Sequence, residues 1–472
     1  MPVQRLGLPR HKRRMSREAG SGLRAGRRRT ANPFDVEYGR IALRPSWSEA
    51  RECHTEMAVQ ALVSEMREGA RRKGCSAKSQ SFGEVREEEN MQNFTFYNPV
   101  KMVFGKGSIQ QLCTLVPAGQ KILMTYGGGS IKQNGVYDEV KQALGDRAII
   151  EFGGIQPNPR YETLMKAVEI CRREGIGFLL SVGGGSVLDG TKFIAVATYF
   201  TDGDPWDIVA KFAPAEKALP IGCVLTLPAT GSEMNNASVI SRDSTQEKFA
   251  YFNPGNFPRF SILDPETTLS LPIQQTRNGI VDAFAHVMEQ YMTYPADAAL
   301  QDRQSEALLL ALLDEGPKVV NTPTDAAARA NIMWVAAQAL NGLIACGVPQ
   351  DWTTHMIGHE LTAFYGLDHA QTLAVVMPAV WQHQKSAKAA KLAQYGGHVL
   401  GLPPSEDIAG QAIQKTEELF RSLGMKTRLS EYGIGAEKFE EIGARFEQRG
   451  LKLGEHGAIG RKEVVEILNL CQ

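Results

Sequence analysis

Two clusters of glycine, each directly after a short apolar run, constrain the fold of this chain more than any other feature. Both clusters read GGGS, at 127–130 and at 183–186. Glycines between a buried strand and a helix let the backbone approach a phosphate, and the free N–H groups at the helix start bind its charge. A tight turn without a ligand is the alternative for a single cluster. Two clusters favour a dinucleotide site, because ligands bind at the carboxyl ends of strands in open sheets.

Short β-branched runs alternate with amphipathic stretches from Met91 to about residue 270. This alternation is typical of parallel βαβ units and predicts a dinucleotide-binding domain over residues 91–270. The sequence lacks the G-x-G-x-x-G fingerprint at both clusters, so the domain is expected to be a variant form. Strands are expected at 121–126, 148–152 and 178–182, and helices at 161–174 and 187–200.

The residues after the first cluster indicate which dinucleotide is bound. NAD sites place a carboxylate on the adenosine ribose, and that carboxylate would repel the 2′-phosphate of NADP. After Tyr126 the chain offers glycines and Ser130, and it has no acidic residue before Asp138. We therefore expect NADP(H) as the cofactor.

Helical spacing replaces the strand pattern from about residue 271. Clear examples are 306–313, 330–344 and 373–381. An all-helical domain is therefore expected over residues 271–472. The longest apolar stretches are well short of the ~18–20 residues that span a bilayer, so no membrane-spanning helix and no membrane partner are expected.

Four of the nine histidines lie in two groups within this helical half. His286 follows Asp282 by four residues among apolar side chains, and His359 follows His355 by four, so each pair shares a helix face. His369 comes after a glycine break and can turn back to the same point. A buried carboxylate beside imidazoles needs a partner charge, and one carboxylate with three imidazoles suits Fe(II) or Zn(II). Individually satisfied core histidines are the alternative, and spacing alone does not say which three histidines are ligands.

The first ninety residues differ in kind from the rest of the chain. They hold 19 Lys+Arg and 12 Asp+Glu, whereas residues 91–472 hold 33 and 40. Three interpretations are a basic arm for nucleic acid, an organelle transit peptide, and a mis-assigned translation start, with Met91 as the true start. We favour the last, with residues 1–90 a disordered or non-native extension, because ordered patterning begins abruptly at Met91. The acidic remainder gives no reason to expect a nucleic-acid partner.

The cysteines indicate the redox compartment. All seven are scattered, without C-x-x-C spacing, and the chain does not open on a secretory signal peptide. Scattered thiols in a long chain are typical of reduced, mostly structural cysteines. We therefore expect a cytoplasmic protein.

From Met91 to its end the chain resembles the iron-containing (group III) alcohol dehydrogenases, and among them the YqhD-type NADP-dependent aldehyde reductases. The resemblance rests on several motifs in order. These are FGKG at 104–107, both GGGS clusters, SVLDGTK at 186–192, LTLPATGSE at 225–233, LDP at 263–265, NGIVDAFAH at 278–286 and the segment 355–369. Two positions depart from the wider family and agree with this branch: the loop at 226–233, which reads TLPATGSE, and Ala370. This branch looks like it uses zinc where other members use iron.

The resemblance implies a role for individual residues. It makes Asp282, His286, His355 and His369 the metal ligands and leaves His359 as a non-ligand histidine of the active site. The implied cofactor contacts are Gly128, Gly129 and Ser130 at the 2′-phosphate end, Gly184, Gly185, Ser186 and Asp189 at the pyrophosphate, and Thr226, Leu227, Asn235 and Lys248. The resemblance further implies a Rossmann-like N-terminal domain, an all-helical metal-binding C-terminal domain, a dehydroquinate synthase-like fold overall, and a homodimer.

Together these features predict reversible hydride transfer between NADP(H) and short- to medium-chain aldehydes or primary alcohols, of the butanol dehydrogenase kind. The metal, Zn(II) or Fe(II), is expected to polarise the carbonyl group, and His359 to relay a proton. A related metal-dependent polyol dehydrogenase of the glycerol type is an alternative with the same fold. A metal hydrolase without a redox role is a further alternative, against which the two glycine clusters argue. A nucleic-acid-binding, non-enzymatic interpretation rests on the basic arm alone.

Overall fold

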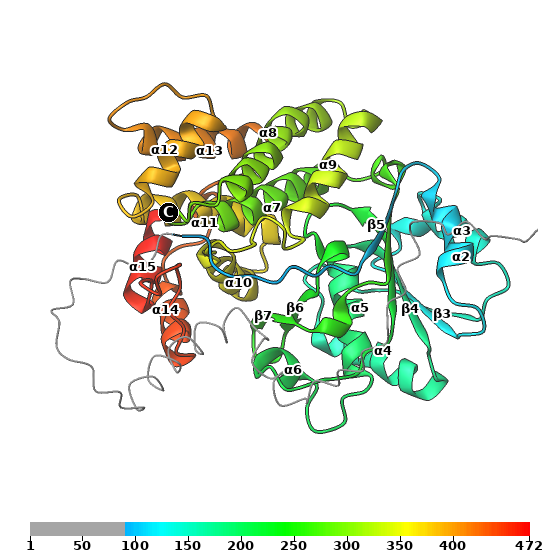
Figure 1. The fold of residues 1–472 in the computed structure, drawn as a ribbon. Helices are drawn as coiled ribbons and strands as arrows, with labels where there is room; N and C mark the ends of the chain where they lie inside the picture. The colour runs from blue at the N-terminus through cyan, green and yellow to red at the C-terminus, as the bar shows by residue number, and fades with distance from the viewer. Residues whose placement is uncertain (1–89) are drawn as a thin grey trace, which may run out of the picture. The chain divides into compact units, whose positions relative to one another are not determined.

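The computed structural model describes residues 90–472, so the predictions made for the first 89 residues lie outside the described part. Its N-terminal half is built on a six-stranded sheet whose neighbouring strands all run parallel (Figure 1). In spatial order the strands are β1 (Lys101–Phe104), β8 (Phe260–Leu263), β5 (Ile221–Leu227), β4 (Phe178–Gly184), β2 (Ile122–Thr125) and β3 (Ile149–Phe152). The strands predicted at 121–126, 148–152 and 178–182 are thus confirmed as β2, β3 and β4.

The register of this sheet brings the two glycine clusters to one edge. β2 and β4 are neighbours, with Thr125 opposite Ser181. The first cluster, 127–130, begins two residues after β2 ends at Thr125. The second, 183–186, spans the last two residues of β4 and the first two of α5. The carboxyl ends of parallel strands meet at the same edge, so both clusters lie side by side there.

Helices pack on both faces of the sheet. They are α2 (Leu112–Leu115), α3 (Val136–Leu144), α4 (Tyr161–Glu174), α5 (Gly185–Ala197) and α6 (Trp206–Ala210). Helix α4 has the predicted bounds, whereas α5 begins two residues before the predicted start and ends at Ala197. Nearly every residue of α5 is buried, because β4, α4 and the hairpin strand β6 all pack against it. Gly190 permits this packing, since a Cβ there would lie 2.7 Å from Cδ2 of Leu164.

One element was missed by the sequence analysis. The strands β6 (Ala237–Arg242) and β7 (Glu247–Phe252) form an antiparallel hairpin separate from the main sheet. Its connection, 243–246, carries none of the two-residue turn signals that mark tight hairpins, and Gln246 adopts a left-handed backbone with φ 50°.

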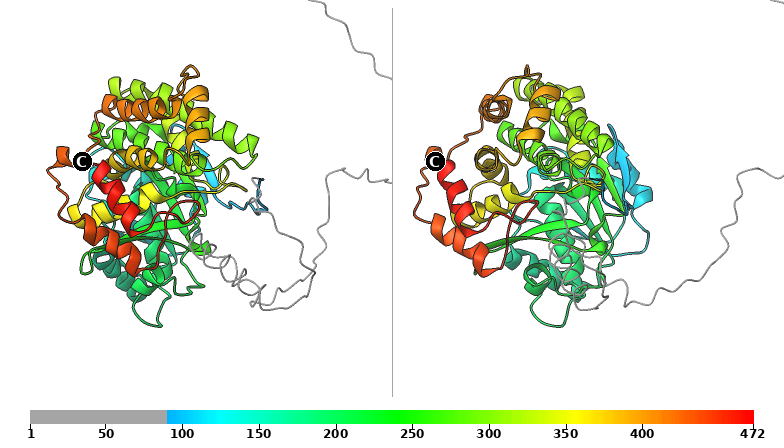
Figure 2. Two further views of the ribbon diagram at one scale, coloured as in Figure 1. Left: turned by 90° about the vertical axis from the view of Figure 1, so that its left-hand side faces the viewer. Right: turned by 60° about the vertical axis from the view of Figure 1, so that its left-hand side comes forward.

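The C-terminal half is helical, as predicted. Its helices are α7 (Ile273–Tyr291), α8 (Ala299–Asn321), α9 (Ala326–Ala339), α10 (Thr353–Tyr365), α11 (His369–His383), α12 (Ala389–His398), α13 (Ile408–Ser422), α14 (Phe439–Gln448) and α15 (Arg461–Leu470). Figure 2 shows these helices gathered beside the sheet half. The helix predicted over 330–344 ends early, at Ala339, because Gly342 and Gly347 adopt left-handed backbone in the loop that follows. Within residues 90–472, the search for a helix both long enough and apolar enough to cross a membrane finds none.

Candidate metal centre and cofactor-binding site

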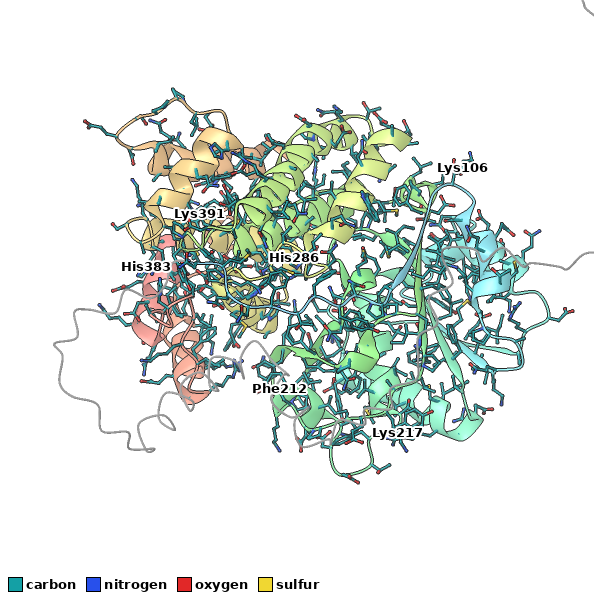
Figure 3. All side chains as sticks on the ribbon, viewed as in Figure 1. Lys106, Phe212, Lys217, His286, His383 and Lys391 are labelled. Atoms are coloured by element: carbon teal, nitrogen blue, oxygen red, sulfur yellow. The ribbon has the colours of Figure 1, made fainter. Side chains whose placement is uncertain are left out.

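Four predicted metal ligands converge on one point in the helical half. Asp282 and His286 lie one turn apart on α7, His355 lies on α10, and His369 is the first residue of α11. Oδ1 of Asp282 lies 3.7 Å from Nδ1 of His286, 3.9 Å from Nε2 of His355 and 3.7 Å from Nε2 of His369. Gly366 follows the last residue of α10 with φ 69°, and this turn brings His369 back to the other three residues. The position of His286 is labelled in Figure 3. These four residues are called the ligand cluster below.

The chemistry of the ligand cluster suits a divalent metal ion. Oδ1 of Asp282, Nδ1 of His286 and Nε2 of His355 are buried, and each lacks a hydrogen-bond partner. These three atoms lie within 4.8 Å of one another. Buried polar atoms are nearly always paired, so a group of orphans facing one point indicates a missing partner. One carboxylate and several imidazoles are donors that Zn(II) and Fe(II) prefer.

Glu289, which the sequence analysis missed, fixes the orientation of His355. Its carboxylate accepts a hydrogen bond from Nδ1 of His355 and another, 3.2 Å long, from the backbone N–H of the same residue. This leaves Nε2 of His355 facing Asp282, as a second partner of a metal-ligating imidazole does. Glu289 lies seven residues after Asp282 and three after His286. The helical spacing that identified Asp282 and His286 as a pair could therefore also have identified Glu289.

Burial and charge set the pKa values of the histidines. Burial lowers the pKa of His286 to about 4 and holds that of His369 well below its usual value. Burial also opposes the charged form of His355, but the carboxylates of Glu289 and Asp282 outweigh it and raise the pKa to about 9. The contrast follows from geometry, because His355 lies between two carboxylates and the others do not.

His359 lies beside the ligand cluster, one helical turn after His355. Its ring centroid is 5.4 Å from that of His369, and its buried Nε2 has no hydrogen-bond partner. Burial, with the neighbouring Lys248 and His355, keeps its pKa well below the usual value. A neutral imidazole with a free nitrogen is therefore held next to the cluster.

The two glycine clusters meet different physical requirements. In the second, a Cβ on Gly184 would lie 3.0 Å from Cβ of Leu227, and one on Gly185 would lie 2.3 Å from Oγ1 of Thr230. In the first, Gly128 and Gly129 face open space, and Gly129 has φ 99°. Close packing explains the second cluster and backbone conformation the first, where the open edge leaves room for a ligand.

Several predicted cofactor residues fix the loop that follows β5 by hydrogen bonds. Thr226 and Leu227 are the last two residues of β5, directly before this loop. Asp189 accepts hydrogen bonds from Oγ of Ser232 (2.6 Å) and from the backbone N–H of Val239 (3.0 Å). Asn235 donates to the carbonyls of Gly231 (3.0 Å) and Leu340 (3.1 Å). The side chains of Asp189 and Asn235 are thus engaged with protein atoms and fix the backbone of this loop.

Lys192 on α5, which the sequence analysis missed, binds the same loop. Its buried ammonium donates to the carbonyls of Ser232 (2.7 Å), Asn235 (3.0 Å) and Ala237 (2.8 Å). Burial lowers the pKa of Lys192 to about 8. Three carbonyls from one loop converge on this single cation, which ties the loop to α5.

Lys248 joins the cofactor half to the ligand cluster. It lies on β7, and its Nζ is 2.8 Å from Oδ1 of Asn158 and 3.4 Å from Nδ1 of His369. Burial lowers the pKa of Lys248 to about 8, against the opposite effect of Asp282. A cation on the sheet half therefore touches a predicted metal ligand on the helical half, and it marks where the two predicted sites meet.

Comparisons with known proteins agree with this arrangement. Residues 99–265 match the family model of iron-containing alcohol dehydrogenases, and residues 276–471 match the model of the C-terminal part of that family. The chain is 50% identical to the NADPH-dependent aldehyde reductase YqhD of Escherichia coli, over 78% of this chain and 96% of that one. It is 44% identical to an NADP-dependent alcohol dehydrogenase of Entamoeba histolytica, over 80% and 99%. The crystal structure of E. coli YqhD superimposes with a TM-score of 0.80 at 47% identity, covering 81% of this chain and all of that one.

Proposed function

Because this chain belongs to the iron-containing alcohol dehydrogenase family, we propose that it transfers a hydride between NADP(H) and short- to medium-chain aldehydes or primary alcohols at a divalent metal ion. One observation carries the proposal. The ligand cluster, with its unpartnered atoms, is joined to the sheet half through Lys248, whose Nζ contacts His369 of the cluster and Asn158 in the loop after β3. A metal site alone would serve many reactions, but a metal site joined to a dinucleotide edge serves redox chemistry.

One set of residues would hold the metal ion, and another would bind the cofactor. A divalent cation held by Asp282, His286, His355 and His369, either Zn(II) or Fe(II), would supply a Lewis acid for the carbonyl group, and NADPH would supply the hydride. Glu289 turns His355 toward the other ligands. The backbone at Gly184, Gly185 and Ser186 presents the start of α5 to the pyrophosphate.

The edge of the sheet beside β2 favours NADP(H) over NAD(H). A Cβ on Gly128 or Gly129 would meet no atom within 4 Å, and Ser130 is exposed, so there is open space for a 2′-phosphate. The carboxylate of Glu151 on β3 is engaged, since it accepts hydrogen bonds from the hydroxyls of Tyr137 (2.6 Å) and Tyr126 (3.2 Å) and pairs with Lys132 (3.2 Å). Its negative charge is therefore offset and does not repel a phosphate.

The proposal includes a homodimer, a cytoplasmic location and a division into residues 91–270 and 271–472. Dimer formation is supported by β1, an edge strand with exposed aromatic side chains around it. Phe104 on β1 is 45% exposed, Trp334, which packs edge-to-face against it, is 42% exposed, and Tyr97, four residues before β1, is 72% exposed. A reducing compartment is supported by the five cysteines of the described residues, all of which are free thiols.

The activity is tested with a panel of substrates and cofactors. The full chain, after metal analysis, is assayed for butyraldehyde reduction with NADPH and with NADH, and for glycerol oxidation with NADP and NAD. We expect the highest kcat/KM for butyraldehyde with NADPH. A higher kcat/KM for glycerol would show that the protein is a polyol dehydrogenase and not an aldehyde reductase. A metal-loaded chain that does not change NADPH fluorescence on mixing would contradict redox function and favour a hydrolase.

We propose that His359 relays a proton between solvent and the product oxygen. Replacing His359 by alanine is expected to lower kcat about a hundredfold, the factor typical for loss of a positioned acid–base group, and to change the pH profile of kcat. His383 on α11 provides a matched control, because its ring pairs with Glu466 away from the cluster. Full activity with an unshifted pH profile in His359→Ala would show that the relay is elsewhere.

A further inference from the structure

Two arginines of the C-terminal region form a buried ionic group with Glu360 of α10. Nη1 of Arg445 lies 3.1 Å from Oε2 of Glu360, and Nη1 of Arg449 lies 2.5 Å from Oε1. The Glu360 side chain is only 3% exposed, and the two arginines are 16% and 22% exposed. Arg445 lies on α14 and Arg449 directly follows it. Together the three residues are called the arginine clamp below.

Each arginine of the clamp also reaches the β6–β7 hairpin. Nη1 of Arg445 donates a 2.8 Å hydrogen bond to the backbone carbonyl of Gln246, the last residue of the connection before β7. The guanidinium of Arg449 stacks over the ring of Phe249, 4.7 Å from its centroid. Helix α10 therefore lies with α14 on one side and the hairpin on the other, and the two arginines join all three (Figure 1).

The residue between these hairpin contacts is Lys248. Side chains alternate in direction along a strand, so Glu247 and Phe249 share a face and Lys248 points from the opposite one. Nη2 of Arg449 lies 3.9 Å from Oε1 of Glu247 on the clamp face. On the opposite face, Nζ of Lys248 contacts Asn158 and His369. The clamp thus contacts β7 at Glu247 and Phe249, on the face of the strand opposite to that of Lys248.

We infer that the arginine clamp is a positioning device for the cofactor: it fixes β7 against α10 and so sets where the Lys248 ammonium meets bound NADPH. This inference rests on the proposed function, in which Lys248 contacts the cofactor. The contacts of the arginines support this positioning role. If they only attached α14 to α10, they would need no contact with the hairpin. The exposed pairs of Arg461 with Glu440 and Glu447 already tie α14 to α15.

The test is a double-mutant cycle on NADPH affinity, measured by fluorescence titration. Lys248→Met removes the cofactor contact. Arg445→Lys keeps a positive charge beside Glu360, so that folding survives. Its shorter side chain does not carry the ammonium to the point between Glu360 and the Gln246 carbonyl where Nη1 of Arg445 lies. Each single variant is expected to raise the Kd for NADPH about tenfold, and the double variant no more than Lys248→Met alone, because both act through one contact. Arg461→Gln, which breaks two exposed pairs of the same helix, is expected to leave the Kd unchanged.

The outcomes separate this inference from the proposed function. A wild-type chain that does not bind NADPH would contradict the function itself. A wild-type chain that binds NADPH, with Arg445→Lys binding as tightly, would overturn the clamp. So would effects of Arg445→Lys and Lys248→Met that simply multiply, because independent losses are what a purely structural role of the arginines produces.

Discussion

Replacing Asp282 by asparagine is expected to remove the metal and to lower kcat/KM for aldehyde reduction at least about a thousandfold, which corresponds to several kcal/mol of transition-state stabilisation. Asp282 is the one anion of the ligand cluster, and its Oδ1 lies 3.7–3.9 Å from a nitrogen of each of the three histidines. Asparagine keeps the shape and removes the charge. Metal content is measured by inductively coupled plasma mass spectrometry and activity with NADPH and butyraldehyde.

The same chemical change elsewhere provides the control. Asp314 is exposed on α8, and Asp314→Asn is expected to retain the metal content and the activity of the wild type. If Asp282→Asn keeps a full equivalent of metal together with its activity, the ligand cluster is not the metal site.

Replacing Gly185 by alanine is expected to weaken NADPH binding about a hundredfold, the loss that a displacement of about 1 Å can cause at a functional site. The added Cβ would lie 2.3 Å from Oγ1 and 2.5 Å from Cγ2 of Thr230. Gly185 is the first residue of α5, so a shift of its backbone that relieves this contact displaces the N–H groups proposed to bind the pyrophosphate. Affinity is measured by fluorescence titration, with the Tm as a check on folding.

Gly397 supplies the matched control for this substitution. It lies on α12 with open space around it, and alanine is the better helix former there. Gly397→Ala is therefore expected to bind NADPH as the wild type does, at an equal or higher Tm. Unchanged affinity in Gly185→Ala would mean that the cofactor does not use the start of α5.

The sequence predicted those features that local pattern determines. The glycine clusters after β2 and β4 and the helix α4 follow from apolar runs and their periodicity, which act over a few residues. The pairing of Asp282 with His286 follows from helical spacing in the same way. The domain classes, α/β then helical, follow from where these patterns change near residue 270.

Features that depend on distant parts of the chain were not predicted. The Glu289 carboxylate meets His355 across 66 residues, and Lys192 meets the 232–237 loop across 40 or more. The arginine clamp joins residues 85 and 89 positions apart. Buried charges of this kind look in a sequence like ordinary surface residues, because their partners are set by tertiary packing alone.

We propose that one metal ion, held by Asp282, His286, His355 and His369, supports NADPH-dependent aldehyde reduction. The direct test is to strip the full chain of metal with a chelator, return Zn(II) or Fe(II) in measured amounts, and follow butyraldehyde reduction by NADPH. We expect activity to fall to background in the stripped chain and to return in proportion to added metal, up to one ion per chain. Undiminished activity in the metal-free chain would contradict it.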